Sequence, residues 1–509
     1  MATSDPQPRP TRRQVFSRAA AALGTGVAVQ ATGGFDPAAA APTSAGPWGH
    51  AVGDPRGSDI VITTGRGAEA RFGLMFKQLP AYAPPDGLLL DLADGMRDPR
   101  VPGTDPSTVD EFDNPDVPAG FTFLGQFIDH DMTLDTTPLT QQQADPKGLV
   151  NFDTPRFDLG SVYGRGPALD KQLYESDGKR LRLVQNENGV LDVPRDSSYN
   201  AFLGDGRDDE NHIILQLQMA IIRLLNTLLA EGNSFADAQR LTRWRFQWVI
   251  VNDYLPHIVG TETLGRLLKP TSKGLAFAGT LYKPKNPNRP MMPLEYSVAA
   301  FRFGHTMIRP EYEMHDGSIV QIFGTAGQDL RGTCPMRADV EADWNYFFEI
   351  PGMEPPDDRN MSRKMDTLLS LPLFTLPTSV VPEDSGPGAI PRIGSLAARN
   401  LLRGKRLGLP AGQDIATAMG AKVVLSNADL GVTGSGWGKK APLWYYVLKE
   451  AELLHDGLHL GEVGGRIVAE VILGLLFADK SSYLNAAPSW RPGPGDWRMG
   501  NLLQRAGVI

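Results

Sequence analysis

The stretch Gly125-Gln126-Phe127-Ile128-Asp129-His130-Asp131 decides how the rest of this chain is interpreted. Written as a helix, it places Gln126 and His130 on one face, with Asp129 beside Gln126. Asp131 is turned by about 100° from His130 around the helix axis. A neutral histidine beside an amide can move protons, while Asp129 could pair or react covalently and Asp131 could hold a hard cation. A solvated helix end can carry the same triplet, so the rest of the chain must distinguish the two interpretations.

The composition is that of an ordinary globular protein with an acidic balance. Of the 509 residues, 41% are hydrophobic and 21% are charged, which allows a large core, and the formal net charge is −8. An acidic chain lacks the positive field that gathers phosphates, which argues against a nucleic-acid binder or a basic membrane-surface protein. Cys334 is the only cysteine, so an intrachain disulfide and a thiolate metal cluster are both excluded.

Residues 1–42 are predicted to be a twin-arginine (Tat) signal peptide. The stretch Thr11-Arg12-Arg13-Gln14-Val15-Phe16 is followed by the weakly apolar residues 19–31 and by an Ala/Pro-rich segment with small-residue cleavage sites. The protein is therefore expected to be secreted or periplasmic. Because the Tat route carries folded proteins, a cofactor could be loaded before export. Residues 43–58 are expected to form a linker.

Residues 59–509 are predicted to form one large, mainly α domain with a long irregular N-terminal wrap and few short strands. Residues 59–120 are rich in Pro, Gly and Asp and show little periodicity. Beyond the signal peptide, no segment reaches the roughly 18 to 20 uncharged apolar residues of a membrane span, and Ile467–Ala478 is expected to be a buried core helix. Helical spacing predicts helices over Glu210–Glu231, Phe235–His257, Pro293–Arg309, Ala397–Arg403, Asp414–Met419, Leu443–Leu454 and Gly461–Ala478.

Two further helix pairs carry residue types suited to oxidative chemistry. Arg207 and Glu210 lie one turn apart, and an arginine fixed beside a carboxylate could stabilise a developing oxyanion. Arg302 and His305 lie three residues apart, and Gly304 would let a flat group approach the backbone, as an iron-bound imidazole under a porphyrin requires. Acid-rich helix starts and histidines in apolar helices are each more often structural, so neither pair decides the function alone.

Together, the motifs G-Q-F-x-D-H-D, S-V-Y-G, R-x-x-E-N and F-R-x-G-H-T resemble those of the animal-type haem peroxidases, in the peroxidase–cyclooxygenase superfamily. Their order and separations are similar to the family pattern from about residue 60 to the C-terminus. The resemblance implies a secreted bacterial member with a haem-peroxidase fold that binds haem b. It also implies an enzyme that reduces hydrogen peroxide and oxidises small donors such as phenols or halides.

The resemblance assigns roles to three residues of the peroxide side. His130 matches the distal histidine, the general base that takes a proton from hydrogen peroxide and returns it to the leaving oxygen. Gln126 matches the distal glutamine that positions water or a small anion. Arg207 matches the distal arginine that steadies the charge during O–O cleavage.

The haem-binding residues are implied in the same way. His305 matches the proximal iron ligand, with Arg302 three residues before it, while Asp129 and Glu210 match the carboxylates that form ester bonds to haem methyl groups. The proximal histidine of the family has an asparagine on its second nitrogen, and Gln413 stands at the position that we match to it. Asn211 follows Glu210 where one family member has methionine, so a sulfonium link to haem is not expected.

A calcium site is also implied. Asp131 matches a side-chain ligand of the family's structural calcium, together with Thr154, the carbonyl of Arg156 and Asp158. Alternating ligands on an irregular loop suit a cation that takes six to eight oxygens. Gly160 departs from the pattern, because the family loop offers another oxygen side chain there.

Two alternative functions remain at this stage. A haem-dependent fatty-acid dioxygenase relies on a tyrosyl radical three residues before the proximal histidine, where this chain has Arg302; Tyr296 lies nine residues from His305. A catalytically inactive haem- or calcium-binding interaction module is the other alternative. The departures at Gly160 and Gln413 favour it, whereas a binding module has no need of the catalytic residues that are present.

Overall fold

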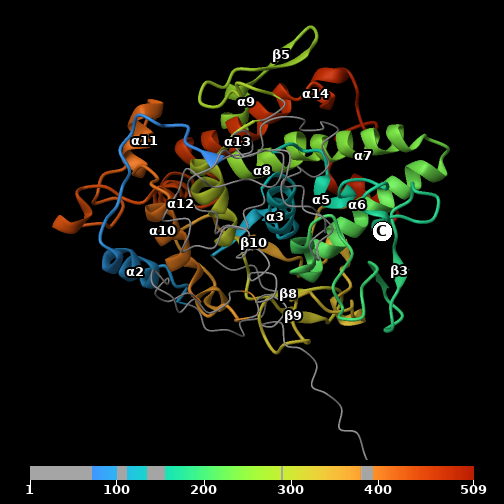
Figure 1. The fold of residues 1–509 in the computed structure, drawn as a ribbon. Helices are drawn as coiled ribbons and strands as arrows, with labels where there is room; N and C mark the ends of the chain where they lie inside the picture. The colour runs from blue at the N-terminus through green and yellow to red at the C-terminus, as the bar shows by residue number, and fades with distance from the viewer. Residues whose placement is uncertain (1–71, 100–111, 134–154, 288–289, 379, 381–393) are drawn as a thin grey trace, which may run out of the picture.

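Helix α3 (Gly120–Met132) lies near the centre of the fold and contains the stretch that led the sequence interpretation (Figure 1). The structure is a computed structural model that describes residues 72–99, 112–133, 155–287, 290–378, 380 and 394–509. Gly125 lets α3 approach its neighbours closely, because a Cβ at that position would lie 2.7 Å from the hydroxyl of Tyr254. The helix is therefore held tightly against the segment that carries Tyr254.

The described part of the chain is mainly helical, as the sequence predicted. The other α-helices are α2 (Asp86–Gly95), α5 (Gly160–Tyr163), α6 (His212–Ala230), α7 (Phe235–Val249), α8 (Leu255–Val259), α9 (Thr261–Leu267), α10 (Leu396–Arg406), α11 (Gly412–Met419), α12 (Leu443–His455), α13 (Glu462–Ala478), α14 (Tyr483–Ala486) and α15 (Met499–Ala506). Tighter 3₁₀ turns are η2 (Lys171–Leu173), η3 (Gly206–Asp209), η6 (Ala300–His305), η7 (Ala338–Val340), η8 (Trp344–Tyr346), η9 (Leu371–Phe374) and η10 (Ser435–Trp437). Two π-helical segments are η4 (Ile250–Tyr254) and η5 (Glu295–Ala299).

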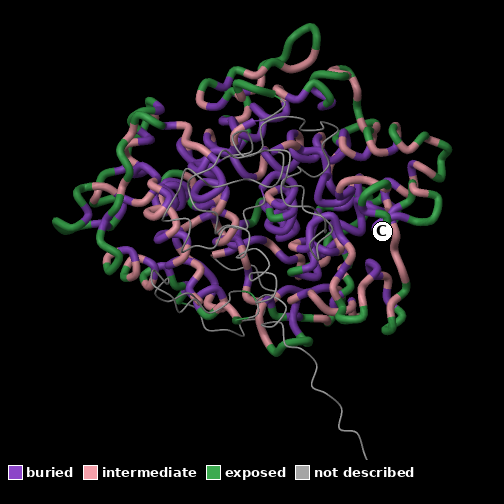
Figure 2. Tube along the Cα trace, viewed as in Figure 1, coloured by how far each residue is buried: buried purple, intermediate pink, exposed green. Residues whose placement is uncertain are grey.

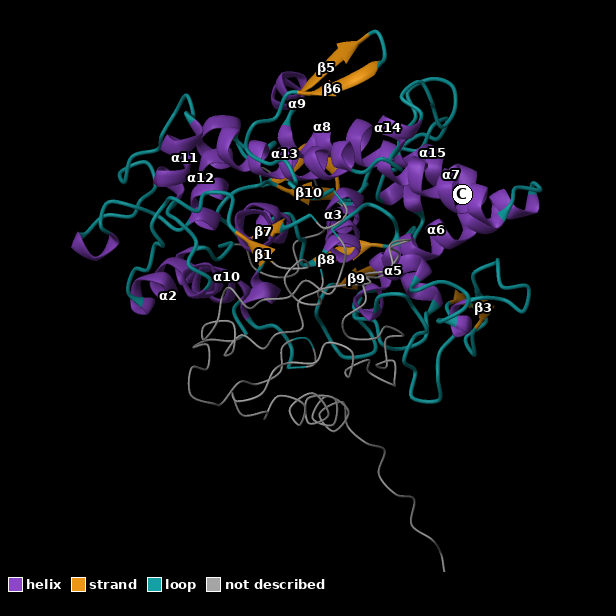
Figure 3. Ribbon diagram, turned by 45° about the horizontal axis from the view of Figure 1, so that its top comes forward, coloured by secondary structure: helices purple, strands orange, loops and turns teal. Residues whose placement is uncertain are grey.

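The described strands are short and form two-stranded sheets at scattered places in the fold (Figure 3). The parallel pair is β1 (Phe72–Gly73) with β7 (Met292–Pro293). The antiparallel pairs are β2 (Asp113–Pro118) with β10 (Met361–Arg363), β3 (Val184–Gln185) with β4 (Leu191–Asp192), β5 (Leu268–Thr271) with β6 (Gly274–Phe277), and β8 (Glu311–Glu313) with β9 (Ile319–Gln321). The predicted fold class, mainly α with few short strands, is confirmed.

The core is apolar and central, and the exposed residues gather at the rim (Figure 2). Helix α6 shows why: most of its residues are apolar, and its N-terminus is capped by Asn211, whose side chain accepts a hydrogen bond from Ile213 N. Of the described helices, α6 alone is long and apolar enough to cross a membrane, but 72% of that stretch is buried inside the protein. Its apolar surface is thus used in the core.

Ser234 caps α7 by accepting a hydrogen bond from Asp237 N. The prediction of one regular helix over Pro293–Arg309 is wrong, because the winding of this segment changes along its length. The segment begins as the π-helical η5, continues as the 3₁₀ turn η6 and ends at His305. Helical periodicity in sequence does not distinguish 3.6 residues per turn from wider or tighter winding, and such irregular turns often occur at functional sites.

The expectation of an irregular segment over residues 59–120 is also incomplete. Its described part includes α2, whose residues Leu89 and Ala93 are buried. Lys405 of α10 reaches the first residue of α2, with Nζ 2.5 Å from a carboxylate oxygen of Asp86. Tertiary packing therefore stabilises a helix that a Pro- and Gly-rich environment obscured.

Candidate active site

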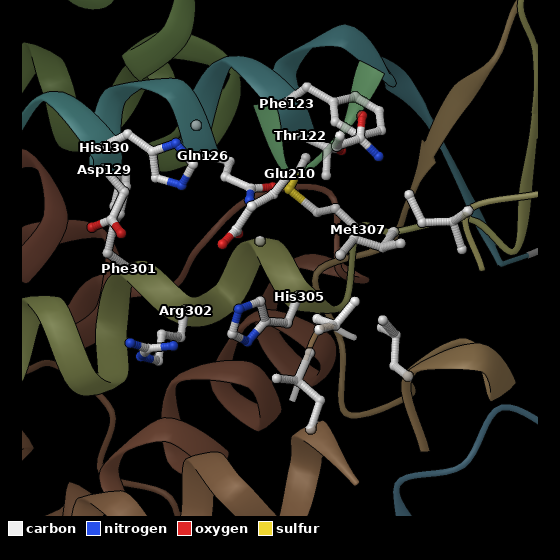
Figure 4. A pocket seen from close by; sticks show the side chains of 18 of the residues that line it. Thr122, Phe123, Gln126, Asp129, His130, Glu210, Phe301, Arg302, His305 and Met307 are labelled. Carbon is white, nitrogen blue, oxygen red and sulfur yellow. The ribbon is translucent and has the colours of Figure 1, made fainter. Parts of the chain in front are cut away.

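A cavity of about 320 Å³ lies between α3 and the η5–η6 segment. Figure 4 shows Gln126, His130 and Glu210 on one side of it, and Arg302 and His305 on the other. Asp129 also lines the cavity. The structure therefore brings together six residues that the sequence had placed in three separate motifs.

Gln126, Asp129 and Glu210 all line this cavity, and none of the three is fully buried. Gln126 is the one exposed residue of α3, Asp129 is half-buried, and the other residues of that helix are buried. Glu210, which follows η3, is exposed and lines the same space. An amide and two carboxylates presented to an internal cavity are expensive to keep without a polar occupant.

His130 is paired with a carboxylate that the sequence interpretation did not single out. Its Nδ1 lies 2.8 Å from Oδ1 of Asp208, and the two residues are 4% and 0% exposed. Because a carboxylate oxygen accepts, Nδ1 of His130 donates and carries the proton. Asp208 follows Arg207 directly, so a signal was present in the sequence, but acid-rich helix starts usually indicate capping alone.

Arg207 is not placed as the sequence predicted. Its guanidinium forms an ion pair with Asp205 at 2.6 Å and donates to the backbone carbonyls of His130, at 3.1 Å, and of Thr133. Arg207 is not among the residues that line the cavity. The physical reason is local: Asp205 is buried two residues earlier in the same tight turn and accepts from both the backbone and the side chain of Arg207. The prediction that Arg207 faces the peroxide side of the cavity is corrected accordingly.

Arg331, a residue that the sequence interpretation missed, does line the cavity. Its Nη2 lies 2.7 Å from Oδ2 of Asp329, and the neighbouring Gly332 N donates to the carbonyl of Glu210 at 3.1 Å. Arg331 thus brings a guanidinium to the cavity from a segment more than a hundred residues from Glu210 in sequence. No local pattern around Arg331 indicated it.

The opposite wall holds His305 at the end of η6. Burial, together with the positive charge of Arg302, lowers the pKa of His305 to about 3. The imidazole is therefore neutral at pH 7 and has a lone pair for a metal ion. Gly304 leaves open space beside the backbone, since a Cβ there would meet no atom within 4 Å.

The amide that contacts His305 belongs to Asn400 of α10, and this corrects the prediction for Gln413. The Asn400 amide nitrogen lies 2.8 Å from Nδ1 of His305. Gln413, at the start of α11, instead accepts a hydrogen bond from Ala441 N at 2.9 Å and contacts Asn427. Asn400 lies inside the predicted helix Ala397–Arg403, so the residue was visible, but only the packing of α10 against the η5–η6 segment shows where it points.

Charges from several elements converge on Asp129. Burial raises the pKa of this carboxyl, and the positive charges of Arg207 and Arg302 oppose the shift. Arg302 is anchored by donating from Nε to the carbonyl of Ser297 at 3.0 Å. Two arginines thus offset only part of the effect of burial on Asp129.

The residues predicted for calcium are only partly within the described chain. Asp131 accepts hydrogen bonds from Leu159 N, at 3.0 Å, and from Ser161 N, at 3.4 Å, while Asp158 accepts from Gly160 N at 3.2 Å. Both carboxylates therefore accept hydrogen bonds from the backbone of the same short segment, residues 159–161. Arg156 is half-buried there, and Thr154 lies outside the described residues. Within the described ranges, no group of three or more His, Cys, Asp or Glu side chains is placed to hold a metal ion.

The cavity fits a haem in its donor chemistry. A neutral imidazole faces it from one wall, a histidine with a protonated Nδ1 from the other, and two carboxylates project into it. The open space beside Gly304 is where a flat group could approach the backbone. His305 would hold the iron, and Asp129 and Glu210 are the groups able to contact the rim of the ring.

Comparison with known proteins agrees with this chemistry. The family model described as animal haem peroxidase matches residues 130–434, more than half of the chain. Thyroid peroxidase from Rattus norvegicus is 26% identical over 196 residues, which cover 33% of this chain and 20% of that protein. The match thus spans about one fifth of the length of such curated relatives.

Two solved structures show the same fold. Peroxidase A from Dictyostelium discoideum superposes with a TM-score of 0.56 and 16% sequence identity, covering 90% of this chain and 96% of that one. Fatty acid alpha-dioxygenase from Arabidopsis thaliana superposes with a TM-score of 0.52 and 14% identity, covering 84% and 74%. The fold is therefore shared by proteins with different activities, and the site has to distinguish them.

Proposed function

The chain belongs to the animal haem peroxidase family, and we propose that it is a haem peroxidase that reduces hydrogen peroxide and oxidises small donors. The observation that carries the proposal is the cavity with His130 on one wall and His305 on the other. When bound, the haem supplies the iron that exchanges electrons with peroxide and with the donor.

The residues of the His305 wall would bind the haem iron and orient the imidazole that holds it. His305, as a neutral imidazole, would hold the iron through Nε2 with its proton on Nδ1. The Asn400 amide, turned by 180° about its terminal bond, would then accept the hydrogen bond of Nδ1–H through its oxygen. Asn400 fixes the ring plane and sets the electron density of the ligand, as outer partners of metal-bound histidines do. Arg302 places a positive charge near Asp129 and would favour acidic groups of a bound ring on that side.

The residues of the His130 wall move a proton and hold small molecules. Nε2 of His130 takes a proton from one oxygen of hydrogen peroxide and returns it to the other, which leaves as water. Gln126, exposed to the cavity, positions water or a small anion beside it. Arg207 contributes indirectly, because its contacts with the carbonyls of His130 and Thr133 hold the end of α3.

We further propose that Asp129 and Glu210 are ester-linked to the haem. Support comes from their place among the residues that line the cavity and from their position on the side where His130 lies. Burial raises the pKa of the half-buried Asp129 carboxyl, and loss of its charge on ester formation would remove the cost of placing that charge there.

The donors are proposed to be small phenols or halides. Away from the histidines the cavity wall is apolar, with Ile322, Phe323, Leu373 and Leu376 among its residues. Such a wall suits an aromatic ring, while Gln126 offers an amide to a halide. The dioxygenase alternative is less well supported, because Arg302 stands three residues before His305 and Tyr296 is not among the cavity-lining residues.

The first test is the ultraviolet–visible spectrum of the purified protein before and after hydrogen peroxide, followed by acidified organic extraction. A Soret band that shifts with peroxide and stays with the protein is the expected result. A band that extracts freely would retain the peroxidase and remove the esters. Absence of haem after expression with ample haem supply would overturn the catalytic proposal and favour an interaction module.

We also propose calcium binding and export by the Tat route. Calcium would bind at Asp131 and Asp158, whose carboxylates meet the same loop, and chelation should then loosen α3 and broaden the haem spectrum. An unchanged spectrum and unfolding midpoint after chelation would reject the site. Export by the Tat route rests on Arg12 and Arg13, which lie outside the described residues, and the double substitution R12K/R13K should retain the protein in the cytoplasm.

A further inference from the structure

The carboxylate that contacts His130 belongs to Asp208, which lies in a different element. We propose that Asp208 is a positioning residue that holds the proton of His130 on Nδ1 and so presents the lone pair of Nε2 to peroxide. The inference rests on the proposed function and goes further, because it names the group on which the distal base depends.

The geometry of the pair leaves one arrangement of protons. The Nδ1–Oδ1 separation is 2.8 Å, and both side chains are nearly or fully buried. A carboxylate oxygen accepts, so Nδ1 donates, and a neutral imidazole with a proton on Nδ1 has its lone pair on Nε2. His130 lines the cavity, so the ring is presented to the space where peroxide would bind.

The acidic residues around η3 are divided among different partners, which argues against simple helix capping. Asp205 caps the turn and pairs with Arg207. Asp209 forms two contacts with Arg195, at 2.7 and 2.8 Å. Asp208, between them, points to α3 and contacts His130. A run of acids that only favoured the helix N-terminus would not need three separate and specific partners.

The pair also fits the proton transfer. When Nε2 takes a proton from one peroxide oxygen, the ring becomes positively charged, and Asp208 compensates that charge in a buried site. When the proton passes to the second oxygen, the ring returns to its starting form with Nδ1 still protonated. Asp208 therefore acts through His130 and has no contact with peroxide itself.

Two matched substitutions separate this role from a general effect on stability. Asp208→Asn and Asp209→Asn each remove one buried negative charge from the same turn, but only Asp208 contacts His130. In the haem-loaded protein, Asp208→Asn should slow the reaction with hydrogen peroxide by roughly 10–100-fold. Asp209→Asn should leave that rate constant within about threefold, even where it lowers the unfolding midpoint.

A second readout does not depend on turnover. Hydrogen cyanide must give up its proton to bind ferric haem, so its association rate should fall in Asp208→Asn in parallel with the peroxide rate. Reduction by the donor, which needs no distal base, should remain unchanged. Equal cyanide and peroxide rates in the two variants would overturn the inference, while a wild-type protein that does not react with peroxide would instead overturn the proposed function.

A measurement on the wild-type protein covers the case in which Asp208→Asn does not fold. Nitrogen-15 spectra of the histidine-labelled cyanide complex, assigned with His130→Gln, should show the His130 proton on Nδ1. A proton found on Nε2 and absent from Nδ1 would contradict the proposed role.

Discussion

The two walls of the cavity hold their histidines in different ways. His130 projects from a regular helix and has a buried carboxylate as its partner, whereas His305 ends an irregular π and 3₁₀ segment and has a neutral amide as its partner. A general base must become positively charged for part of its cycle, and a carboxylate compensates that charge. A metal ligand must stay neutral, and an amide orients it without adding charge.

The comparison extends to the neighbouring charges. Arg302 lies close enough to His305 to disfavour its protonation, which burial already opposes. On the other wall, Arg207 is paired with Asp205 and contacts backbone carbonyls. The electrostatic environment thus keeps one ring neutral and allows the other to take up a proton.

The largest expected effect comes from breaking the His130 wall. His130→Ala should reduce the rate constant for the reaction with hydrogen peroxide by roughly 10²–10⁴-fold, because the general base is lost. The Soret absorbance per protein should remain close to that of the wild type, since the iron ligand is untouched. Stopped-flow absorbance measures the rate, and a variant as fast as the wild type would end the assignment of His130 as the base.

The next effect tests the amide of the His305 wall. Asn400→Ala should weaken haem retention by about 10–100-fold, because the ring of His305 loses its orienting partner. Gln413→Ala is the matched control, since it also removes an amide but one that bonds to Ala441 N. Because Asp129 and Glu210 are proposed to tether the haem, both substitutions are made in an Asp129→Asn, Glu210→Gln background, in which transfer of haem to apomyoglobin measures retention. Faster loss from Gln413→Ala than from Asn400→Ala would identify Gln413, and not Asn400, as the partner of His305.

A smaller effect is expected where α3 meets the loop that follows it. Asp131→Ala removes a carboxylate that accepts from Leu159 N and Ser161 N, and should cost about 1.5–3 kcal/mol of unfolding free energy. Urea denaturation in the presence of a chelator measures the direct bonds alone. If the loss appears only when calcium is supplied, the ion and not the hydrogen bonds joins the two segments.

The smallest effect distinguishes His130 from a second buried histidine near the same wall. Burial lowers the pKa of His212 to about 4, and its Nε2 lies 3.6 Å from the thiol of Cys334 instead of a carboxylate. The folded state leaves His212 neutral while the unfolded chain takes up a proton below about pH 6.5. Its contribution to stability is therefore present above that pH and is lost as the pH falls towards 4.

Between pH 6.5 and 5 this group should account for ~2 kcal/mol of lost unfolding free energy. His212→Gln should make the stability less dependent on pH over that range, as measured by urea denaturation at closely spaced pH values. An equally steep loss in the variant would assign the acid sensitivity to other groups.

Local sequence was enough to find six of the residues that line the cavity, although it missed Arg331. The spacing of Gln126, Asp129 and His130 follows from helical geometry, which the sequence of α3 satisfies, and all three line the cavity. His305 beside Gly304 was likewise recognisable, because a glycine next to a ligand allows a flat group to approach. These features depend on neighbours within one or two turns of the same segment.

Only the tertiary structure decided which partner each of those residues has. Asp208 lies 78 residues from His130 in sequence, and Asn400 lies 95 residues from His305. The sequence identified Arg207, but the packing of the tight turn directs its guanidinium to Asp205 and not into the cavity. A hydrogen-bond partner is determined by which elements approach within about 3 Å. That approach is set by the burial of whole helix faces and not by the few residues around each functional group.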